Sequence, residues 1–544
     1  MTPDPDLIFT GGSVFANAGP AHASTVAVRG GRIVAVGADD VRELAGTATE
    51  VVDLAGGFLI PGFQDAHVHP VQGGLERMRC DLTSLRTRET YLSAIKEYAE
   101  GHRDPEWITG GGWTMAAFPG GTPTAADLDS AVPDRPVFLP NRDHHGAWVN
   151  SRALDLAGID RQTPDPGDGR IERDAAGDPT GSLHEGAMGM VGRLLPSNSG
   201  DDMLAGLIEG QRYLHALGVT AWQDAIIGRY ASMNDATDAY LKVADDGRLT
   251  ARVVGALWWD RDRGAEQIAE LVERRAQIQT ERFRATSVKI MQDGVVENFT
   301  AGLIEPYLDG SGEETGNRGL SFVDPVALKR HVTALDSEGF QVHVHAIGDR
   351  AVREALDAFE AARSANGDGD HRHHIAHIQV IHPDDVPRFA ALDVTANMQA
   401  LWAAYEPQMV ELTIPFIGEE RAGWQYPFAD LVRSGARLAA GSDWPVSTPD
   451  PLKAIHVAVN RRLAGADGAD YDAFIPEQAL DVSTAVTAYT AGSARVNHLD
   501  ETGAVEVGKL ADLVILDRDI RAIPDEEIAE ANVLATYVDG AQVY

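Results

Sequence analysis

The sequence predicts an α/β protein built around a closed parallel (β/α)8 TIM barrel, with a small β-sandwich domain and an inserted α+β segment. From residue 200 onward, short apolar strands alternate with amphipathic helices, which is typical of a parallel sheet covered by helices. Glycine-rich turns separate β-branched runs at both ends of the chain, and the regular alternation is interrupted between residues 71 and 198. The barrel is therefore expected to carry additions at its ends and after its first strand.

The β-sandwich domain is expected to form from residues 1–56 together with residues 496–544. Its β-branched runs are residues 7–16, 24–37, 49–56, 503–518 and 533–544. The turns between them are typical of a small β meander. Because such runs flank a long α/β middle, we expect the two chain ends to meet in one domain.

Residues 57–70 are assigned to the first barrel strand, because the apolar run from Phe58 to Pro61 is short and bracketed by glycine and proline. Residues 71–198 are assigned to the inserted segment. Its predicted elements are helices at 85–100 and 150–158, strands at 107–113 and 136–141, and a hairpin in the polar stretch 164–182. This insertion is expected to bear on the site that the first strand opens.

Residues 199–495 are expected to supply the rest of the barrel, each strand being preceded by a helix. The predicted strands are residues 218–225, 251–258, 285–292, 340–345, 372–378, 393–398 and 437–441. Together with the strand before His67 they make the eight strands of a closed barrel. An open doubly wound sheet is the alternative, but no G-x-G-x-x-G turn follows a first strand.

Composition limits the classes of partner. The 544-residue chain contains 46 Lys and Arg against 82 Asp and Glu, a net charge of −36, which argues against nucleic acid and anionic membranes as partners. No stretch resembles a secretion signal or a membrane span, so we expect a cytoplasmic protein with a small-molecule substrate; a homodimer is compatible with this interpretation. Cys80 is the only cysteine, which excludes an intrachain disulfide and a cysteine-based zinc site.

Side chains that can bind metal follow the predicted barrel strands. His67 and His69 lie two apart in GFQDAHVHP, so that both face one side of an extended chain. The other candidates are Lys289, His343, His345, His374, His377 and Asp443. The carboxyl ends of barrel strands form the face that holds the active site in this fold. Any one of these residues alone has an ordinary explanation, such as a Lys289–Asp293 pair, but together they indicate a metal site.

These motifs resemble those of the amidohydrolase superfamily, and specifically its amidohydrolase-3 branch, which includes N-substituted formamide deformylases. The resemblance covers nearly the whole chain. The segments that carry it are GFQDAHVHP, SVKIMQDG, FQVHVHAIGDRAV, HHIAHIQ, GSDWPVSTPDP, GKLADLVILDRD and YVDGAQVY.

The resemblance implies a set of metal ligands. They are His67, His69, His345, His377 and Asp443, with Lys289 carboxylated on its amine to bridge two divalent ions. The pattern H-A-I-G-D selects His345 over His343, and I-x-H selects His377 over His374. Zinc is the expected metal, with manganese, iron or nickel, or a single ion, as alternatives. Ala376 departs from the family pattern, in which many relatives carry Glu, so a group that orients His377 is expected to be missing or replaced.

The expected activity is metal-dependent hydrolysis of an amide-type carbon–nitrogen bond other than a peptide bond. Divalent ions would activate water and polarise the substrate carbonyl, and Asp443 would serve as ligand and proton shuttle. His145, in DHHGAW, is a candidate substrate contact or electrophile, with a structural role equally open. The same site could deaminate a ring or cleave an ester, carbamate or phosphoester. A non-catalytic metal-binding scaffold is the alternative from another class, and retention of Asp443 argues against it.

Tryptophans suggest the character of the substrate. Of the nine in the chain, Trp222, Trp258, Trp259, Trp402 and Trp444 fall at or beyond predicted strand ends, and Trp113 and Trp148 lie in the insertion. The residues selected as substrate contacts are Trp113, Trp222, Trp259, Trp402 and Trp444, together with His145. Buried tryptophans are commonly core residues, and those within strands could point between barrel and helices. If they wall the site, the substrate carries an aromatic or bulky apolar group.

Overall fold

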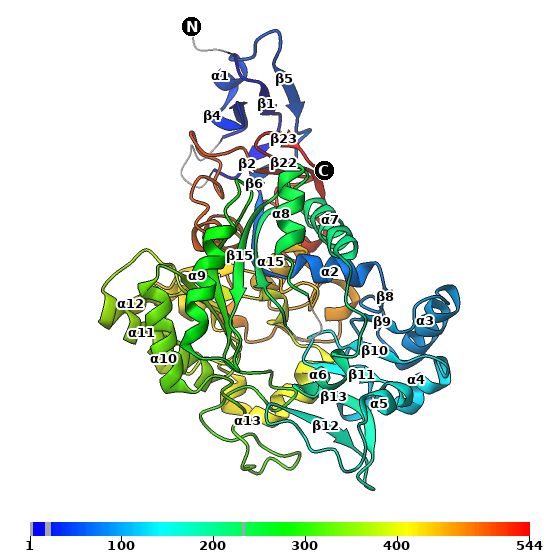
Figure 1. The fold of residues 1–544 in the computed structure, drawn as a ribbon. Coiled ribbons are helices and arrows are strands. Elements are labelled where there is room, and N and C mark those ends of the chain that lie inside the picture. Colours follow the sequence, from blue (N-terminus) through cyan, green and yellow to red (C-terminus); the bar gives the residue numbers. More distant parts are fainter. Residues whose placement is uncertain (1–3, 17–22, 231–233) are drawn as a thin grey trace.

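The computed structural model describes residues 4–16, 23–230 and 234–544, and its centre is a sheet of eight parallel strands (Figure 1). The strands follow one another around the sheet in chain order. They are β7 (Phe63–Val68), β14 (Val219–Ile227), β15 (Arg252–Trp258), β16 (Phe283–Met291), β17 (Gln341–Ala346), β18 (His374–His377), β19 (Thr395–Met398) and β20 (Leu438–Ala440). This confirms the predicted (β/α)8 barrel.

The barrel closes between β7 and the segment that follows β20, a junction that we term the closing seam (residues 65–69 with 441–444). The backbone N–H of Asp443 donates to the carbonyl of His67 over 2.8 Å, and that of His69 donates to Trp444 over 2.9 Å. The Asp65 carboxylate accepts hydrogen bonds from the backbone N–H and the hydroxyl of Ser442, at 3.0 and 2.5 Å. The first and last strands are thereby fixed to each other at their carboxyl ends.

Helices cover the outside of the barrel between successive strands. They include α7 (Gly200–Ala216), α8 (Thr237–Asp245), α9 (Ile268–Gln277), α10 (Pro325–Ser337), α11 (Asp349–Asn366), α12 (Val386–Leu392), α14 (Phe428–Arg433) and α15 (Pro451–Asn460). Local signals set their starts: Ser199 and Asp202 form a capping box on α7, and the Asp324 side chain caps α10 ahead of Pro325. The sequence predicts a helix over residues 231–246, of which 231–233 lie outside the described residues, and α8 begins at Thr237.

The two chain ends meet in a domain of two small sheets at the amino-terminal end of the barrel (Figure 1). One sheet contains β4 (Arg32–Gly37), β3 (Thr25–Arg29), β1 (Leu7–Thr10) and β5 (Glu50–Asp53), in that order. The other contains β2 (Ser13–Val14), β6 (Phe58–Pro61), β21 (Leu513–Leu516), β22 (Val533–Val538) and β23 (Ala541–Gln542). Apolar side chains from both chain ends, among them Phe9, Leu59 and Ile515, share its core.

The assignment of residues 57–70 to a single barrel strand is wrong. Phe58–Pro61 forms β6, which pairs antiparallel with β21 in the terminal domain, and only β7 enters the barrel. Gly62 separates the two strands at a close approach, since a Cβ there would lie 2.3 Å from the Thr220 hydroxyl oxygen. The prediction that Phe58–Pro61 forms a strand is confirmed. Periodicity alone, however, does not determine to which sheet a short buried strand belongs.

The insertion follows α2 (Pro70–Arg77) and carries a six-stranded sheet near the carboxyl ends of the barrel strands (Figure 1). In spatial order the strands are β12 (Gly169–Arg173), β13 (Pro179–Glu185), β11 (Gly146–Val149), β10 (Val137–Pro140), β9 (Ile108–Gly111) and β8 (Cys80–Asp81). The predicted hairpin is present as the antiparallel pair β12 and β13. The insertion also contains the helices α3 (Arg88–Gly101), α4 (Ala125–Ala131), α5 (Ser151–Ala157) and α6 (Met188–Gly192). Within the described ranges, no helix has the length and apolar character needed to cross a membrane.

Candidate active site

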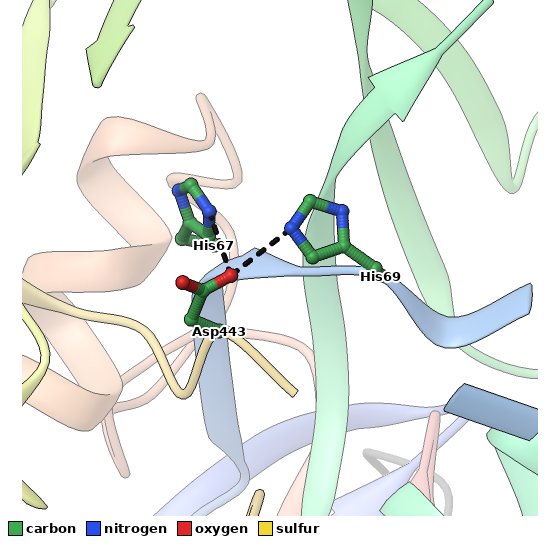
Figure 2. A group of neighbouring side chains, drawn as sticks. All are labelled: His67, His69 and Asp443. Carbon is green, nitrogen blue, oxygen red and sulfur yellow. Dashed lines mark hydrogen bonds and ion pairs between the residues drawn. The ribbon is translucent and has the colours of Figure 1, made fainter. Parts of the chain in front are cut away.

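Three predicted ligands gather at the closing seam: His67 and His69 at the end of β7, and Asp443 after β20. The Nε2 atoms of His67 and His69 lie 3.1 and 3.0 Å from Oδ1 of Asp443 (Figure 2). Their ligand atoms lie within 4.8 Å of one another, close enough for one cation to contact all three. The backbone bonds of the seam fix this geometry, because they join the carrying residues directly.

His377 and His345 lie next to this group, at the ends of β18 and β17. His377 Nδ1 is 3.8 Å from Oδ2 of Asp443, and the His377 ring centroid is 4.7 Å from that of His67 and 4.4 Å from that of His345. Both ring nitrogens of His377 are buried without a hydrogen-bond partner among the described residues, as is Nδ1 of His69. Buried polar atoms are normally paired, so these orphaned nitrogens fit a metal site.

The protonation states also suit a metal. Burial, together with the nearby Lys289, lowers the pKa of His67 to about 3, so its imidazole is neutral at pH 7. Burial opposes ionisation of Asp443, yet its contacts with His67 and His69 hold the pKa well below the usual value. Neutral imidazoles around a carboxylate are the ligand forms that a divalent cation requires. The residues present therefore fit the metal that the fold implies.

Lys289 lies on β16, in register with His343 of β17 and Trp258 of β15. Burial lowers its pKa to about 7, so a large share of the amine is uncharged at neutral pH. The alternative partner Asp293 instead accepts backbone N–H bonds from Ile347, Gly348 and Gly302 at 2.8 to 3.0 Å. Lys289 is thus free to face the cavity with the histidines.

A cavity of about 900 Å³ opens over these residues, and all six predicted ligands contribute to its wall. Charged side chains also line the cavity, and one set of its lining residues is aromatic: Trp258, Trp402, Trp444, Tyr213, Tyr230 and Tyr426. Trp402 stacks on the His377 ring, with 5.5 Å between centroids and 9° between planes. The wall thus offers aromatic surface beside the candidate metal ligands, as small-molecule sites commonly do.

Comparison with known proteins shows to which family the chain belongs. A family model described as the amidohydrolase family matches residues 50–544. The chain belongs to the amidohydrolase family. The amidohydrolase is 33% identical to Protein LONG AFTER FAR-RED 3 of Arabidopsis thaliana, over 99% of this chain and 91% of that one. It is 28% identical to the N-substituted formamide deformylase of Arthrobacter pascens, over 96% and 95% of the two chains.

A solved structure agrees with this membership. The fold resembles that of an uncharacterized metal-dependent hydrolase from Pyrococcus furiosus, with a TM-score of 0.71 and 27% identity over 95% of this chain and 99% of that one. Family and structure together make the amidohydrolase a metal-dependent hydrolase that acts on carbon–nitrogen bonds. The resemblance of its motifs and its predicted barrel are both confirmed.

Three of the tryptophans predicted to contact substrate lie elsewhere. Trp222 points outward and donates its indole N–H to Tyr240 of α8 over 3.2 Å. Trp259 packs against His331 of α10, with ring centroids 4.8 Å apart. Trp113 belongs to the core of the insertion, where it packs on Trp148. Among the described residues, the tryptophans that line the cavity are Trp258, Trp402 and Trp444, of which Trp402 and Trp444 stay predictions as substrate contacts.

His145 comes from the insertion and lines the cavity, with its ring 5.7 Å from that of His345. Its Nδ1 lies 2.9 Å from the Glu185 carboxylate of β13. Although burial opposes the charge, this carboxylate raises the pKa of His145 to about 9. His145 is therefore a cation at neutral pH, with Nε2–H left for the cavity. The sequence carries no signal for Glu185, because it lies 40 residues from His145 and no motif links the two.

Ala376 is fully buried, and other residues position His377. The Gln399 side-chain oxygen accepts the backbone N–H of His377 over 2.6 Å, and Trp402 covers one face of the ring. His377 itself has a φ of 78°, a left-handed conformation that is uncommon outside glycine and turns the side chain out of the strand alternation. Backbone geometry and stacking thus hold His377 in the site.

We expect activity to require a divalent metal, because the four imidazoles and Asp443 converge with orphaned nitrogens at one cavity. Prolonged chelation should abolish hydrolysis, and zinc or manganese should restore it. Activity and metal content are measured on the same preparations. Full turnover by a preparation that elemental analysis shows to be free of metal would contradict the expectation.

We expect Glu185→Gln to shift the alkaline limb of the kcat/KM profile to lower pH. The Glu185 carboxylate holds the His145 proton up to about pH 9, and the neutral amide removes that support, so the charge is lost nearer the ordinary histidine pKa. Glu172→Gln is the matched control, since Glu172 pairs with His184 at 3.3 Å in the same hairpin. Superimposable pH profiles of wild type and Glu185→Gln would mean that His145 is only structural.

Proposed function

We propose that this amidohydrolase cleaves an amide, or a related carbonyl–nitrogen bond, that carries an aromatic or bulky apolar group. The aromatic wall around the histidine and aspartate floor carries the proposal. An indole or phenol wall can add ~0.5–1.5 kcal/mol of ring contact to area burial. Similarity to an N-substituted formamide deformylase supports an amide with a substituent on nitrogen.

The proposed centre would hold two divalent ions, zinc in the first instance, with Lys289 carboxylated on its amine to serve as one of their ligands. Only an uncharged amine can add carbon dioxide, and the lowered pKa of Lys289, about 7, supplies that form near neutrality. A plain ammonium would repel cations, whereas its carbamate offers two anionic oxygens. The ligands would be His67, His69, His345, His377, Asp443 and the modified Lys289.

Bound metal ions would supply an acidified water and polarisation of the substrate carbonyl. The side chains of the protein then transfer the proton and stabilise the negative charge that develops on the substrate. Asp443, kept as a carboxylate, accepts the proton of the attacking water and returns it to the amine nitrogen as the carbon–nitrogen bond breaks. His145 donates Nε2–H toward the oxygen on which negative charge develops. The products are a carboxylic acid and an amine, and the protein regains its starting protonation.

We expect a higher kcat/KM for an N-aryl amide than for the matched N-methyl amide. In Trp258→Leu, the N-aryl value should fall about 2- to 13-fold, the equivalent of ~0.5–1.5 kcal/mol of lost ring contact. The N-methyl value is the internal control and should change less. Equal values for the two substrates in the wild type, or a preference for the small one, would refute the apolar pocket.

We expect Lys289→Ala to lower metal stoichiometry and rate together, with partial rescue by short carboxylic acids that occupy the vacated space. Lys453→Ala is the matched control, because Lys453 lines the same cavity from α15. Metal content by elemental analysis and turnover are compared across the three proteins. Unchanged stoichiometry and rate in Lys289→Ala would show that this lysine bridges no ions, and a ratio of one ion per chain in the wild type would make the centre mononuclear.

A further inference from the structure

Two buried histidines of the barrel interior have no part in the chemistry above. His343 and His374 lie opposite each other on β17 and β18, and neither is exposed to solvent. His343 Nε2 is 2.8 Å from Nδ1 of the ligand His67, and both histidines contact the side-chain oxygen of Gln223 on β14. A chain of polar side chains therefore reaches the metal site from inside the barrel.

The direction of these hydrogen bonds is fixed at one end by backbone carbonyls. Nε2 of Gln341 donates to the carbonyls of Arg372 and Val496 at 2.8 and 2.5 Å, and a carbonyl can only accept. The Gln341 oxygen must therefore face Gln223, whose Nε2 donates to it over 2.9 Å. Gln223 is left with its oxygen toward the two histidines, 2.7 Å from His343 Nδ1 and 3.1 Å from His374 Nε2.

A second backbone group, the N–H of His377, fixes the hydrogen-bond directions at the other end of the network and agrees with this orientation of Gln223. The backbone N–H of His377 can only donate, and it donates to the Gln399 oxygen. Gln399 Nε2 then donates to the Asn397 oxygen over 3.2 Å, which leaves Asn397 Nδ2 to donate to His374 Nδ1, also at 3.2 Å. His374 must thus carry its proton on Nε2, the atom that faces the Gln223 oxygen.

These two ends determine the form of His67. His343 is fully buried with no carboxylate beside it, so its imidazole is neutral and has one donor and one acceptor nitrogen. His343 donates from Nδ1 to Gln223, so its Nε2 accepts, and His67 must donate from Nδ1. With Nδ1 of His67 committed to His343, Nε2 is the nitrogen left to bind a cation, and it lies 3.1 Å from the Asp443 oxygen.

We propose that Gln223 and His343 are positioning residues that hold His67 in the tautomer whose Nε2 lone pair faces the metal. Residues outside the first coordination sphere commonly fix ligand tautomers in this way, usually through a carboxylate or a carbonyl. Here a glutamine–histidine relay performs the task within the barrel core. The proposal depends on metal binding by His67 but not on the substrate suggested above.

Neutron diffraction from crystals of the wild-type protein, exchanged into deuterated buffer near neutral pH, tests the tautomers directly. Deuterium is expected on Nδ1 of His67 and Nδ1 of His343, with none on Nε2 of His343. Deuterium on His343 Nε2, facing His67, would overturn the proposal. This measurement needs neither a variant nor a substrate, so its outcome is separate from that of the proposed function.

Metal affinity tests the consequence, with a matched pair of variants. We expect His343→Leu to weaken zinc binding about 10- to 100-fold, as loss of such partners typically does, in a competition titration against a chromophoric chelator. His374→Leu removes an equally buried imidazole but leaves the His67–His343 bond, so its zinc affinity should change less than about threefold. Both variants should lower Tm. Equal losses of affinity in the two, or none in His343→Leu, would contradict the relay.

Discussion

The hydrogen bonds of the closing seam are the constraint on which the site depends. Eight parallel strands make a barrel only if the first and the last are joined, and here that junction passes through the residues that bear ligands. Asp443 and His69 each contribute a backbone N–H to the seam while their side chains meet in the site. Asp65 secures the turn after β20 through Ser442. Closing the fold and assembling the ligands are therefore one event.

Burial sets the chemical state of what the seam brings together. Low polarity keeps His67 neutral and lowers the pKa of Lys289, whereas Glu185 preserves the charge of His145. His345 of the barrel and His145 of the insertion, whose ring centroids lie 5.7 Å apart, thus carry different charges at the same pH, because burial lowers the pKa of His345 and Glu185 raises that of His145. The carboxylate of Glu185 accounts for the charge of His145, and in the proposed mechanism this charge separates metal binding from the stabilisation of developing negative charge.

Sequence predicts best where a pattern is local. The alternation of strands and helices predicted the barrel, and the ligands follow short motifs at strand ends, so the resemblance located them in the chain. Tryptophan orientation failed because adjacent strand residues point to opposite faces. Trp258 lines the cavity and Trp259 packs outside, a difference of one residue that the sequence does not determine. Glu185 and Gln223 lay beyond prediction because folding alone places them near His145 and His343.

The same seam also determines when the site can exist during synthesis. Asp65 and Ser442 are 377 residues apart in the chain, which at about 5–20 residues per second corresponds to about 20–75 s of translation. Throughout that interval the histidines of the first strand have been made without their aspartate. The terminal domain is completed later still, because β6 pairs with β21, which lies near the carboxyl end of the chain. A ribosome-bound fragment that ends before residue 443 therefore cannot assemble the candidate metal site.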